Sequence, residues 1–130
     1  MSSRDDTPST KPLVDKLGVK PDMRIAVLGV DDDGFRAELS ARVPFGDNPQ
    51  DADIVFLAAT APANVKRIAE LKSQIKRDGA IWVIYRKAQK VFNENDVLHL
   101  GLESGMVDVK VVRFSDTHTA TKFVIRKSER

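Results

Sequence analysis

Three short apolar runs constrain the fold of this chain more than any other feature of its sequence. Each holds at least four consecutive apolar residues, and the runs are Met23–Leu28, Asp53–Ala59 and Ala80–Tyr85. Runs of this kind are typical of strands buried on both faces, as in the middle of a parallel sheet. Parallel neighbours need crossover connections, and helical patterns separate these runs. We therefore expect an α/β fold with helices on both faces of a mostly parallel sheet.

The segments around the runs carry the signals of helices. The longest predicted helix extends from near Pro62 to about Arg77, with Thr60 as its cap. Its apolar positions recur at spacings of three and four and form one stripe, which consists of Val65, Ile68, Leu71 and Ile75. Shorter helices are predicted over residues 13–17, 35–41 and 94–104, and a weak strand near Val43.

The last two predicted strands, Val107–Phe114 and Lys122–Arg126, are joined by a polar turn over residues 115–120. No crossover helix fits into so short a connection, so we expect these strands to be antiparallel neighbours. An otherwise parallel sheet that closes in this way has the edge pattern of the methyltransferase-type Rossmann fold. The expected fold class is therefore a three-layer, Rossmann-like α/β sandwich with a C-terminal antiparallel hairpin.

Length and composition limit the organisation of the chain. A length of 130 residues suits one domain. Residues 1–12 are rich in Ser, Thr, Asp and Pro and are expected to be a disordered tail, with a single shortened domain over residues 13–130. The absence of cysteine excludes disulfides and thiolate zinc sites. Because neither an apolar run of about 18 residues nor a secretory signal is visible, we expect a cytoplasmic protein without membrane contact.

Charge is distributed unevenly, with eight basic and two acidic residues between positions 61 and 90. This segment is either attractive to an acidic partner or, more simply, the solvated face of a helix. Aromatic residues make up only 6% of the chain, so nucleic acid is not an expected partner. The C-terminal hairpin offers an exposed strand edge, which makes a homodimer through this hairpin the expected self-association.

Carboxylates and histidines do not indicate a metal site in this sequence. Asp31, Asp32 and Asp33 follow one another in a turn, where consecutive side chains cannot all point at one ion. His99 is expected on a helix surface and His118 in an exposed turn, without the spacing of a metal site or a catalytic triad. We therefore expect no metal and no catalytic residue among them.

Ligands of open α/β sheets bind at the carboxyl ends of the strands, where the strand order reverses. In this chain that crevice is expected between the first and second apolar runs. Its candidate binding residues follow the three runs along the chain; they are Gly29, Asp31 and Gly34, then Thr60, then Arg86 and Lys87, with Val30 and Ala59 beside them.

Four segments of the sequence resemble a family of small, uncharacterised bacterial proteins of unknown function. They are Pro12–Leu28, Asp78–Val83 (DGAIWV), Gly101–Val111 (GLESGMVDVKV) and Thr121–Arg126 (TKFVIR). The resemblance implies a shortened fold similar to that of S-adenosylmethionine (SAM) methyltransferases, and it implies no particular activity. Members usually have Trp-Pro-Lys-Lys after the third long strand, whereas this chain has Ile-Tyr-Arg-Lys at positions 84–87.

Two features argue against a competent cofactor site. The turn Gly29–Gly34 lacks the closely spaced glycines that let a backbone approach a cofactor, and its three carboxylates would repel a pyrophosphate. Only 25 residues separate Leu28 from Ile54, too few for two complete crossovers, so one strand and one helix are expected to be missing. The favoured interpretation is a non-catalytic binding or regulatory module without a cofactor. The alternatives are a small SAM-dependent methyltransferase and a sensor that holds an anion with Arg86 and Lys87.

Overall fold

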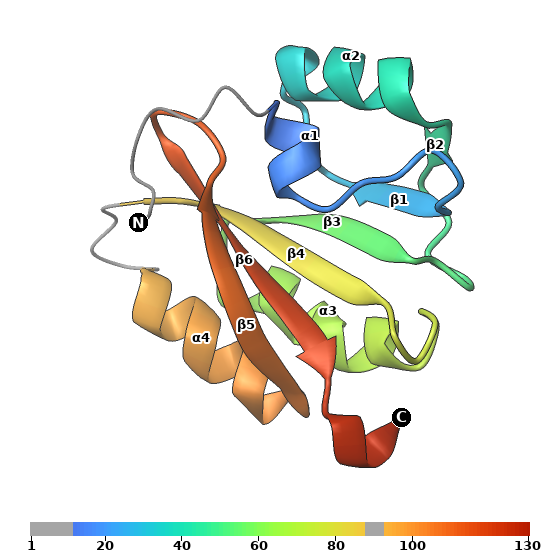
Figure 1. The fold of residues 1–130 in the computed structure, drawn as a ribbon. Coiled ribbons are helices and arrows are strands. Elements are labelled where there is room, and N and C mark those ends of the chain that lie inside the picture. Colours follow the sequence, from blue (N-terminus) through green and yellow to red (C-terminus); the bar gives the residue numbers. More distant parts are fainter. Residues whose placement is uncertain (1–11, 88–92) are drawn as a thin grey trace, which may run out of the picture.

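A computed structural model describes residues 12–87 and 93–130; the predicted tail, up to residue 11, and residues 88–92 lie outside the described residues. The chain forms a three-layer α/β fold in which helices cover both faces of one sheet (Figure 1). The elements in chain order are α1 Leu13–Lys16, β1 Ile25–Leu28, α2 Asp33–Arg42, β2 Phe45–Gly46, β3 Ile54–Ala59, α3 Pro62–Lys72, β4 Ala80–Arg86, α4 Glu94–Glu103, β5 Met106–Arg113, β6 His118–Ile125 and a final 3₁₀ turn, Lys127–Glu129.

The six strands lie in the order β2-β1-β3-β4-β6-β5. The first four in this order are parallel, whereas β6 is antiparallel to both β4 and β5. The predicted fold class and the closing antiparallel hairpin are therefore confirmed. Between β1 and β3 the chain holds one helix and a strand of two residues, so the strand order reverses across a short connection.

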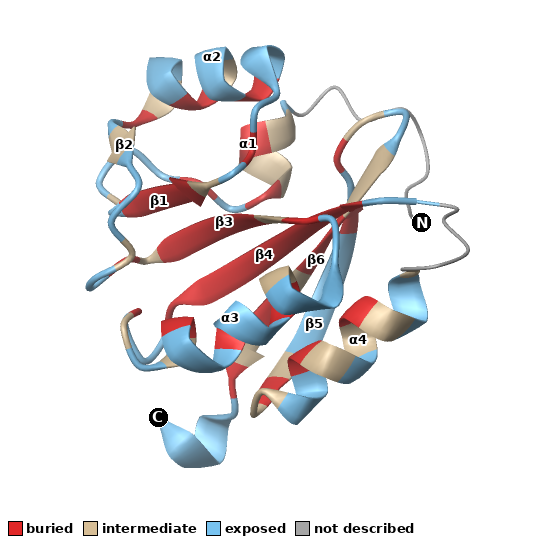
Figure 2. Cartoon of the chain, turned by 180° about the vertical axis from the view of Figure 1, so that it is seen from behind, coloured by how far each residue is buried: buried red, intermediate tan, exposed pale blue. Residues whose placement is uncertain are grey.

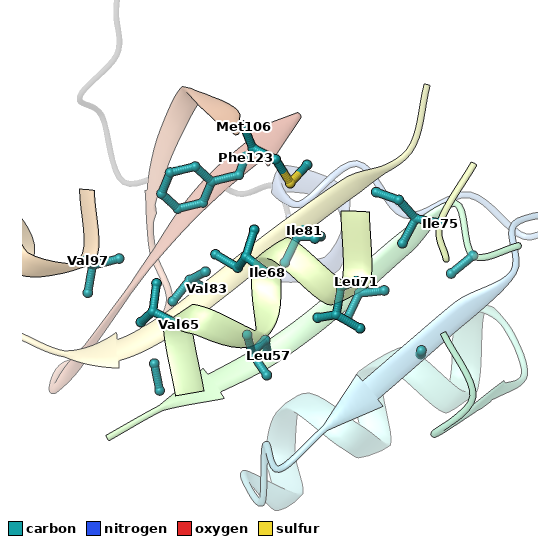
Figure 3. Close-up of a cluster of buried hydrophobic side chains, with 14 of the residues drawn as sticks. Leu57, Val65, Ile68, Leu71, Ile75, Ile81, Val83, Val97, Met106 and Phe123 are labelled. Atoms are coloured by element: carbon teal, nitrogen blue, oxygen red, sulfur yellow. The ribbon is translucent and has the colours of Figure 1, made fainter. Parts of the chain in front are cut away.

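The sheet separates two hydrophobic clusters, and most residues of its central strands, β3 and β4, are buried (Figure 2). On one face the predicted stripe of α3 packs against β3 and β4, with Phe123 of β6 and Val97 of α4 beside it (Figure 3). On the other face α1 and α2 cover β1, β3 and part of β4 (Figure 1). Trp82 belongs to this second cluster, is fully buried, and donates its indole N–H to the carbonyl of Leu17 at 3.1 Å.

Several boundaries of the helices and strands differ from the predicted ones. Helix α2 begins at Asp33, two residues earlier than predicted, because the Asp32 carboxylate accepts the Phe35 N–H at 2.8 Å and caps it. The weak strand lies at Phe45–Gly46, after Pro44 and not at Val43. Helix α3 ends at Lys72 and not near Arg77.

The hairpin turn is also shorter than predicted, and β6 begins at His118. The Phe114 and Ser115 N–H groups donate to the His118 carbonyl, and the Ser115 hydroxyl accepts the N–H groups of Thr117 and His118. These bonds close the turn within four residues. His118 is consequently a half-buried strand residue and not the exposed turn residue that the sequence suggested.

Strand β5 forms one edge of the sheet, next to β6. Its side chains Val109 and Val111 are 53% and 54% exposed, and the pairing with β6 is irregular between Asp108 and Lys110. The homodimer through this hairpin stays a prediction, which light scattering of the wild-type chain and of Val111→Lys would test. Within the described residues, no helix combines the length and the apolar character that a membrane crossing needs.

Candidate functional site

A cleft of about 530 Å³ opens at the carboxyl ends of β1, β3 and β4, under the turn that joins β5 to β6. We name it the hairpin cleft. Its lining comes from four places in the chain; they are Gly29, Val30, Asp31 and Asp32, then Ala58, Ala59 and Thr60, then Ile84 and Arg86, and finally Phe114, Ser115, Thr117 and His118. The cleft lies where the strand order reverses, which is where open α/β sheets bind ligands.

Four of the six residues predicted for the crevice line this cleft, namely Gly29, Asp31, Thr60 and Arg86. Gly34 lies outside its lining because the cap at Asp32 draws that glycine into the first turn of α2. Lys87 also lies outside the lining; its backbone N–H donates to the Thr117 carbonyl at 3.0 Å, which ties the end of β4 to the hairpin turn.

Gly29 allows the backbone to turn sharply at the end of β1. Its φ of +81° is a conformation that side chains other than glycine rarely adopt. A Cβ atom built there would lie 3.5 Å from the Cβ of Ala58, so little space separates this turn from β3. The turn is held from α2 as well, because Arg36 donates to the Val30 carbonyl at 3.1 Å while its guanidinium lies 5.2 Å from the centre of the Phe45 ring.

The loop between β3 and α3 is organised by Asn64 and not by Thr60, which was the predicted cap. The side-chain oxygen of Asn64 accepts the backbone N–H groups of Thr60 and Ala61, both at 3.0 Å, and lies 3.2 Å from the Thr60 hydroxyl. This places Ala61 at the cap position. Thr60 itself is exposed and lines the hairpin cleft.

Sequence reasoning missed the wall of the cleft that the hairpin turn supplies. Phe114 is 7% exposed and its ring lies 5.0 Å from that of Phe35, which is in turn 5.1 Å from Phe56. His118 lies directly opposite Arg86 in the pairing of β6 with β4. Its Nδ1 atom is 2.7 Å from the Thr117 hydroxyl oxygen. The position of the turn over β1 depends on strand register, for which the sequence carries no local signal.

A second hollow, which we name the β2 cleft, adjoins the hairpin cleft and shares Gly29 and Ala58 with it. Its volume is about 410 Å³, and besides residues of β1 it is lined by Arg36, Asp47, Asn64 and Arg67. Asp47 directly follows β2 in the chain. A signal was present, since an acidic residue roughly 20 positions after the first glycine is the ribose ligand of dinucleotide-binding Rossmann folds.

Tyr85 and His99 are titratable residues outside the lining of both clefts. Burial raises the pKa of the Tyr85 phenol above its ordinary value of 10, and this phenol hydrogen-bonds with the Thr121 hydroxyl at 3.2 Å. The predicted surface position of His99 is confirmed, because it is exposed and lies 2.8 Å from Glu103. Across residues 12–87 and 93–130, no three carboxylates and histidines come together in a way that would hold a metal ion.

No protein-family model and no curated protein matches the chain. Solved structures do. A SAM-dependent methyltransferase from Aquifex aeolicus matches with a TM-score of 0.70 and 14% identity, over 88% of this chain and 88% of that chain. The magnesium protoporphyrin IX methyltransferase of Synechocystis PCC 6803, solved with bound SAM, matches with a TM-score of 0.63 and 13% identity, over 88% of this chain and 74% of that chain. The pyocyanin biosynthetic protein PhzM matches with a TM-score of 0.54 and 16% identity over 78% of this chain, which spans 42% of PhzM.

At these identities the matches show the fold alone, and the chain has a methyltransferase-like Rossmann fold. The Aquifex aeolicus protein is matched over the same share of both chains, so the two are of similar length. The sequence-based expectation that the protein uses no cofactor is not supported by these matches, one of which was solved with bound SAM.

Proposed function

We propose that the protein binds SAM across the turn at Gly29 and acts as a small methyltransferase. The observation that carries this proposal is the position of the two adjoining clefts, at the carboxyl ends of β1 and β3, where the strand order reverses. Their volumes of about 530 and 410 Å³ lie within the range of small-molecule sites, which is roughly 300–1,000 Å³. The fold of the structural neighbours supports the same ligand class.

The β2 cleft suits the nucleoside part of such a ligand. The backbone at Gly29 carries no side chain, so a ligand can approach it closely. Asp47 is exposed at the rim of this cleft, and a carboxylate there can accept hydrogen bonds from the two hydroxyls of a ribose. Arg67 on α3 and Asn64 supply donors on the opposite side of the cleft. These residues fit a nucleoside better than they fit a dinucleotide, whose pyrophosphate the carboxylates of residues 31–33 would repel.

The hairpin cleft then remains for the methyl acceptor. When bound, SAM supplies a methyl group activated by its sulfonium charge. Asp31 gives this end of the site a negative charge next to Gly29, which favours a cationic group nearby. The chain's own contribution is to hold two molecules side by side at one edge of the sheet, and such positioning is a large part of catalysis of a reaction between two molecules.

Calorimetry with S-adenosylhomocysteine, the demethylated product of SAM, tests the binding step. We expect micromolar binding by the wild-type chain and at least tenfold weaker binding by Asp47→Asn, since a carboxylate that accepts two hydroxyl groups contributes about 1.5–3 kcal/mol. Asp78→Asn is the matched control. Asp78 is exposed and precedes β4, so it lies at the amino ends of the parallel strands, away from the clefts at their carboxyl ends. A wild-type chain that does not bind this ligand at millimolar concentration would contradict the proposal.

If the chain binds the ligand but transfers no methyl group, the protein is a non-catalytic binding module. This outcome would be recognised when the wild-type chain binds S-adenosylhomocysteine but releases none from SAM in the presence of candidate acceptors. The cleft would then serve a sensor or regulatory module. The substitution Gly29→Val tests the position of the ligand in both cases, because a branched side chain at a φ of +81° disturbs the turn and is expected to abolish ligand binding.

A further inference from the structure

Two basic side chains of the hairpin cleft, Arg86 and His118, come together only through the pairing of β4 with β6. Arg86 ends β4, and His118 begins β6 directly opposite to it. Residues that are directly opposite in an antiparallel pair project their side chains from the same face of the sheet. Both residues line the hairpin cleft. The guanidinium and the imidazole are therefore neighbours within one concave site.

Hydrogen bonds of the hairpin turn orient the imidazole. The Ser115 hydroxyl accepts the His118 backbone N–H at 3.1 Å, and the Thr117 hydroxyl lies 2.7 Å from Nδ1 of the ring. When the Thr117 hydroxyl donates to Nδ1, the ring proton lies on Nε2, and this N–H can donate to an anionic group in the cleft. The guanidinium of Arg86 has five N–H donors in a planar fork, which lets it hold an anion while it keeps another partner.

Charge is separated along the cleft. Its carboxylates, Asp31 and Asp32, follow β1, and that of Asp32 is engaged in capping α2. Strand β4 lies two positions from β1 in the sheet and β6 lies three positions from it. With neighbouring strands about 4.8 Å apart, the axis of β1 lies roughly 10 Å from that of β4 and roughly 14 Å from that of β6. The basic end at the hairpin is therefore suited to an anionic group.

The floor of the cleft is apolar between these two ends. Val30, Ile84 and Phe114 line it while remaining 4%, 3% and 7% exposed. Such a floor takes up the hydrocarbon part of a ligand, in the way of most small-molecule sites, in which a few polar groups orient an apolar body. The arrangement thus selects for a molecule with an apolar body and one charged group.

We infer that the methyl acceptor is a small molecule with an apolar body and a single carboxylate or phosphate, which Arg86 and His118 hold at the hairpin end of the cleft. This inference rests on the proposed function, because it assigns the acceptor half of the same site. It also changes the anion site suggested by the sequence, since His118 and not Lys87 accompanies Arg86. Lys87 lies outside the cleft lining.

Titration of the isotope-labelled full chain with phenyl phosphate and with benzoate, followed by NMR, tests the inference. We expect saturable shifts of residues around the cleft with at least one of these two probes and at most weak shifts with benzyl alcohol, their neutral analogue. Arg86→Gln and His118→Gln should each weaken binding about tenfold, the usual effect of losing one hydrogen bond to a charged group. A response to phenyl phosphate alone identifies a phosphate ligand, and a response to benzoate alone a carboxylate.

Two matched controls exist in the chain. Lys87→Gln removes the neighbouring charge outside the cleft lining, and His99→Gln removes the exposed histidine of α4. Both should change binding by less than twofold. The inference is wrong if neither anion binds at millimolar concentration, if benzyl alcohol binds equally well, or if Lys87→Gln weakens binding as much as Arg86→Gln.

The same variants distinguish this inference from the proposed function. Arg86→Gln should leave the affinity for S-adenosylhomocysteine within about twofold of the wild-type value, and Asp47→Asn should leave phenyl phosphate binding intact. A chain that binds phenyl phosphate through Arg86 and His118 but not S-adenosylhomocysteine retains the anion site and loses the methyltransferase assignment. Circular dichroism spectra and melting temperatures of all variants separate a lost contact from a lost fold.

Discussion

The two walls of the hairpin cleft are built in different ways. The wall that follows β1 consists of consecutive residues, and its shape depends on a glycine at positive φ and on the cap provided by Asp32. The wall that the hairpin turn supplies lies some 85 positions later in the chain and reaches the cleft through the pairing of β6 with β4. Aromatic contacts hold that wall, since Phe114 packs on Phe35 of α2.

The two walls therefore depend on different kinds of interaction. The first wall depends on backbone conformation and local hydrogen bonds, whose loss costs about 1 kcal/mol each. The second depends on buried apolar contacts between distant segments, whose loss costs several times more. Substitutions in the two walls should therefore differ in size, and the following predictions test that order.

The largest effect is expected at the hairpin wall. Phe114→Ala removes a ring that is 7% exposed and 5.0 Å from the ring of Phe35, so it should lower the free energy of unfolding by about 3 kcal/mol. Chemical denaturation measures this loss. Val111→Ala on the same hairpin is the control, because Val111 is 54% exposed and its truncation should change stability by less than about 0.5 kcal/mol. Similar losses for both variants would mean that the aromatic contacts do not hold this wall.

Two glycines, one in the turn after β1 and one in the first turn of α2, should respond to substitution in opposite directions. Gly29→Ala forces a side chain into a φ of +81° and should cost about 1–2 kcal/mol of stability. Gly34→Ala lies in the first turn of α2, with a Cβ position 3.4 Å from the Asp32 carboxylate, and should stabilise the chain by about 0.5 kcal/mol. Thermal and chemical unfolding of both variants check the sign. A loss of equal size at both positions would contradict the helix boundary at Asp33.

The cap of α2 should contribute about 1 kcal/mol. Asp32→Ala removes the acceptor of the Phe35 N–H and is expected to lower stability by about that amount. Asp31→Ala is the matched control; this neighbouring carboxylate is exposed, so its removal should lie within about 0.5 kcal/mol of wild type. Equal losses would indicate a general charge effect and not a cap.

The smallest effect is expected where two lysines of the hairpin oppose each other. Burial lowers the pKa of the Lys122 ammonium, and the charge of Lys110, directly opposite in the sheet, lowers it further. Lys110→Gln should therefore raise the pKa of Lys122 and stabilise the chain by a few tenths of a kcal/mol, roughly the cost of opposed like charges. NMR titration of the lysine side chains measures the pKa.

The pH dependence has a definite sign at this position. The folded chain holds the Lys122 proton less tightly than the unfolded chain does, so its contribution to stability is unfavourable at neutral pH. That penalty disappears as the pH rises through the lowered pKa toward 10.5. In the variant Lys110→Gln, the gain in stability between neutral pH and pH 10.5 should be smaller than in the wild-type chain. A wild-type chain whose stability shows no such rise near the alkaline end, relative to Lys122→Gln, would contradict this account.

Much of the fold was predictable because its signals are local. The apolar runs identified β1, β3 and β4, and the stripe from Val65 to Leu71 identified the buried face of α3. The short final connection identified an antiparallel pair. The prediction failed at boundaries that side-chain caps or turns decide, such as the start of α2 and the start of β6.

The candidate site was predictable only as far as the strand ends are. Strands β1, β3 and β4 end at one edge of a parallel sheet, and this alone brought Gly29, Thr60 and Arg86 to the same cleft. The sequence by itself therefore determined the layers, the sheet and the position of the crevice, because burial on both faces of a strand leaves a pattern in consecutive residues. Tertiary structure decided that His118 joins Arg86 and that Phe114 closes the cleft opposite Val30, because strand register and the packing of distant segments leave no trace in local spacing.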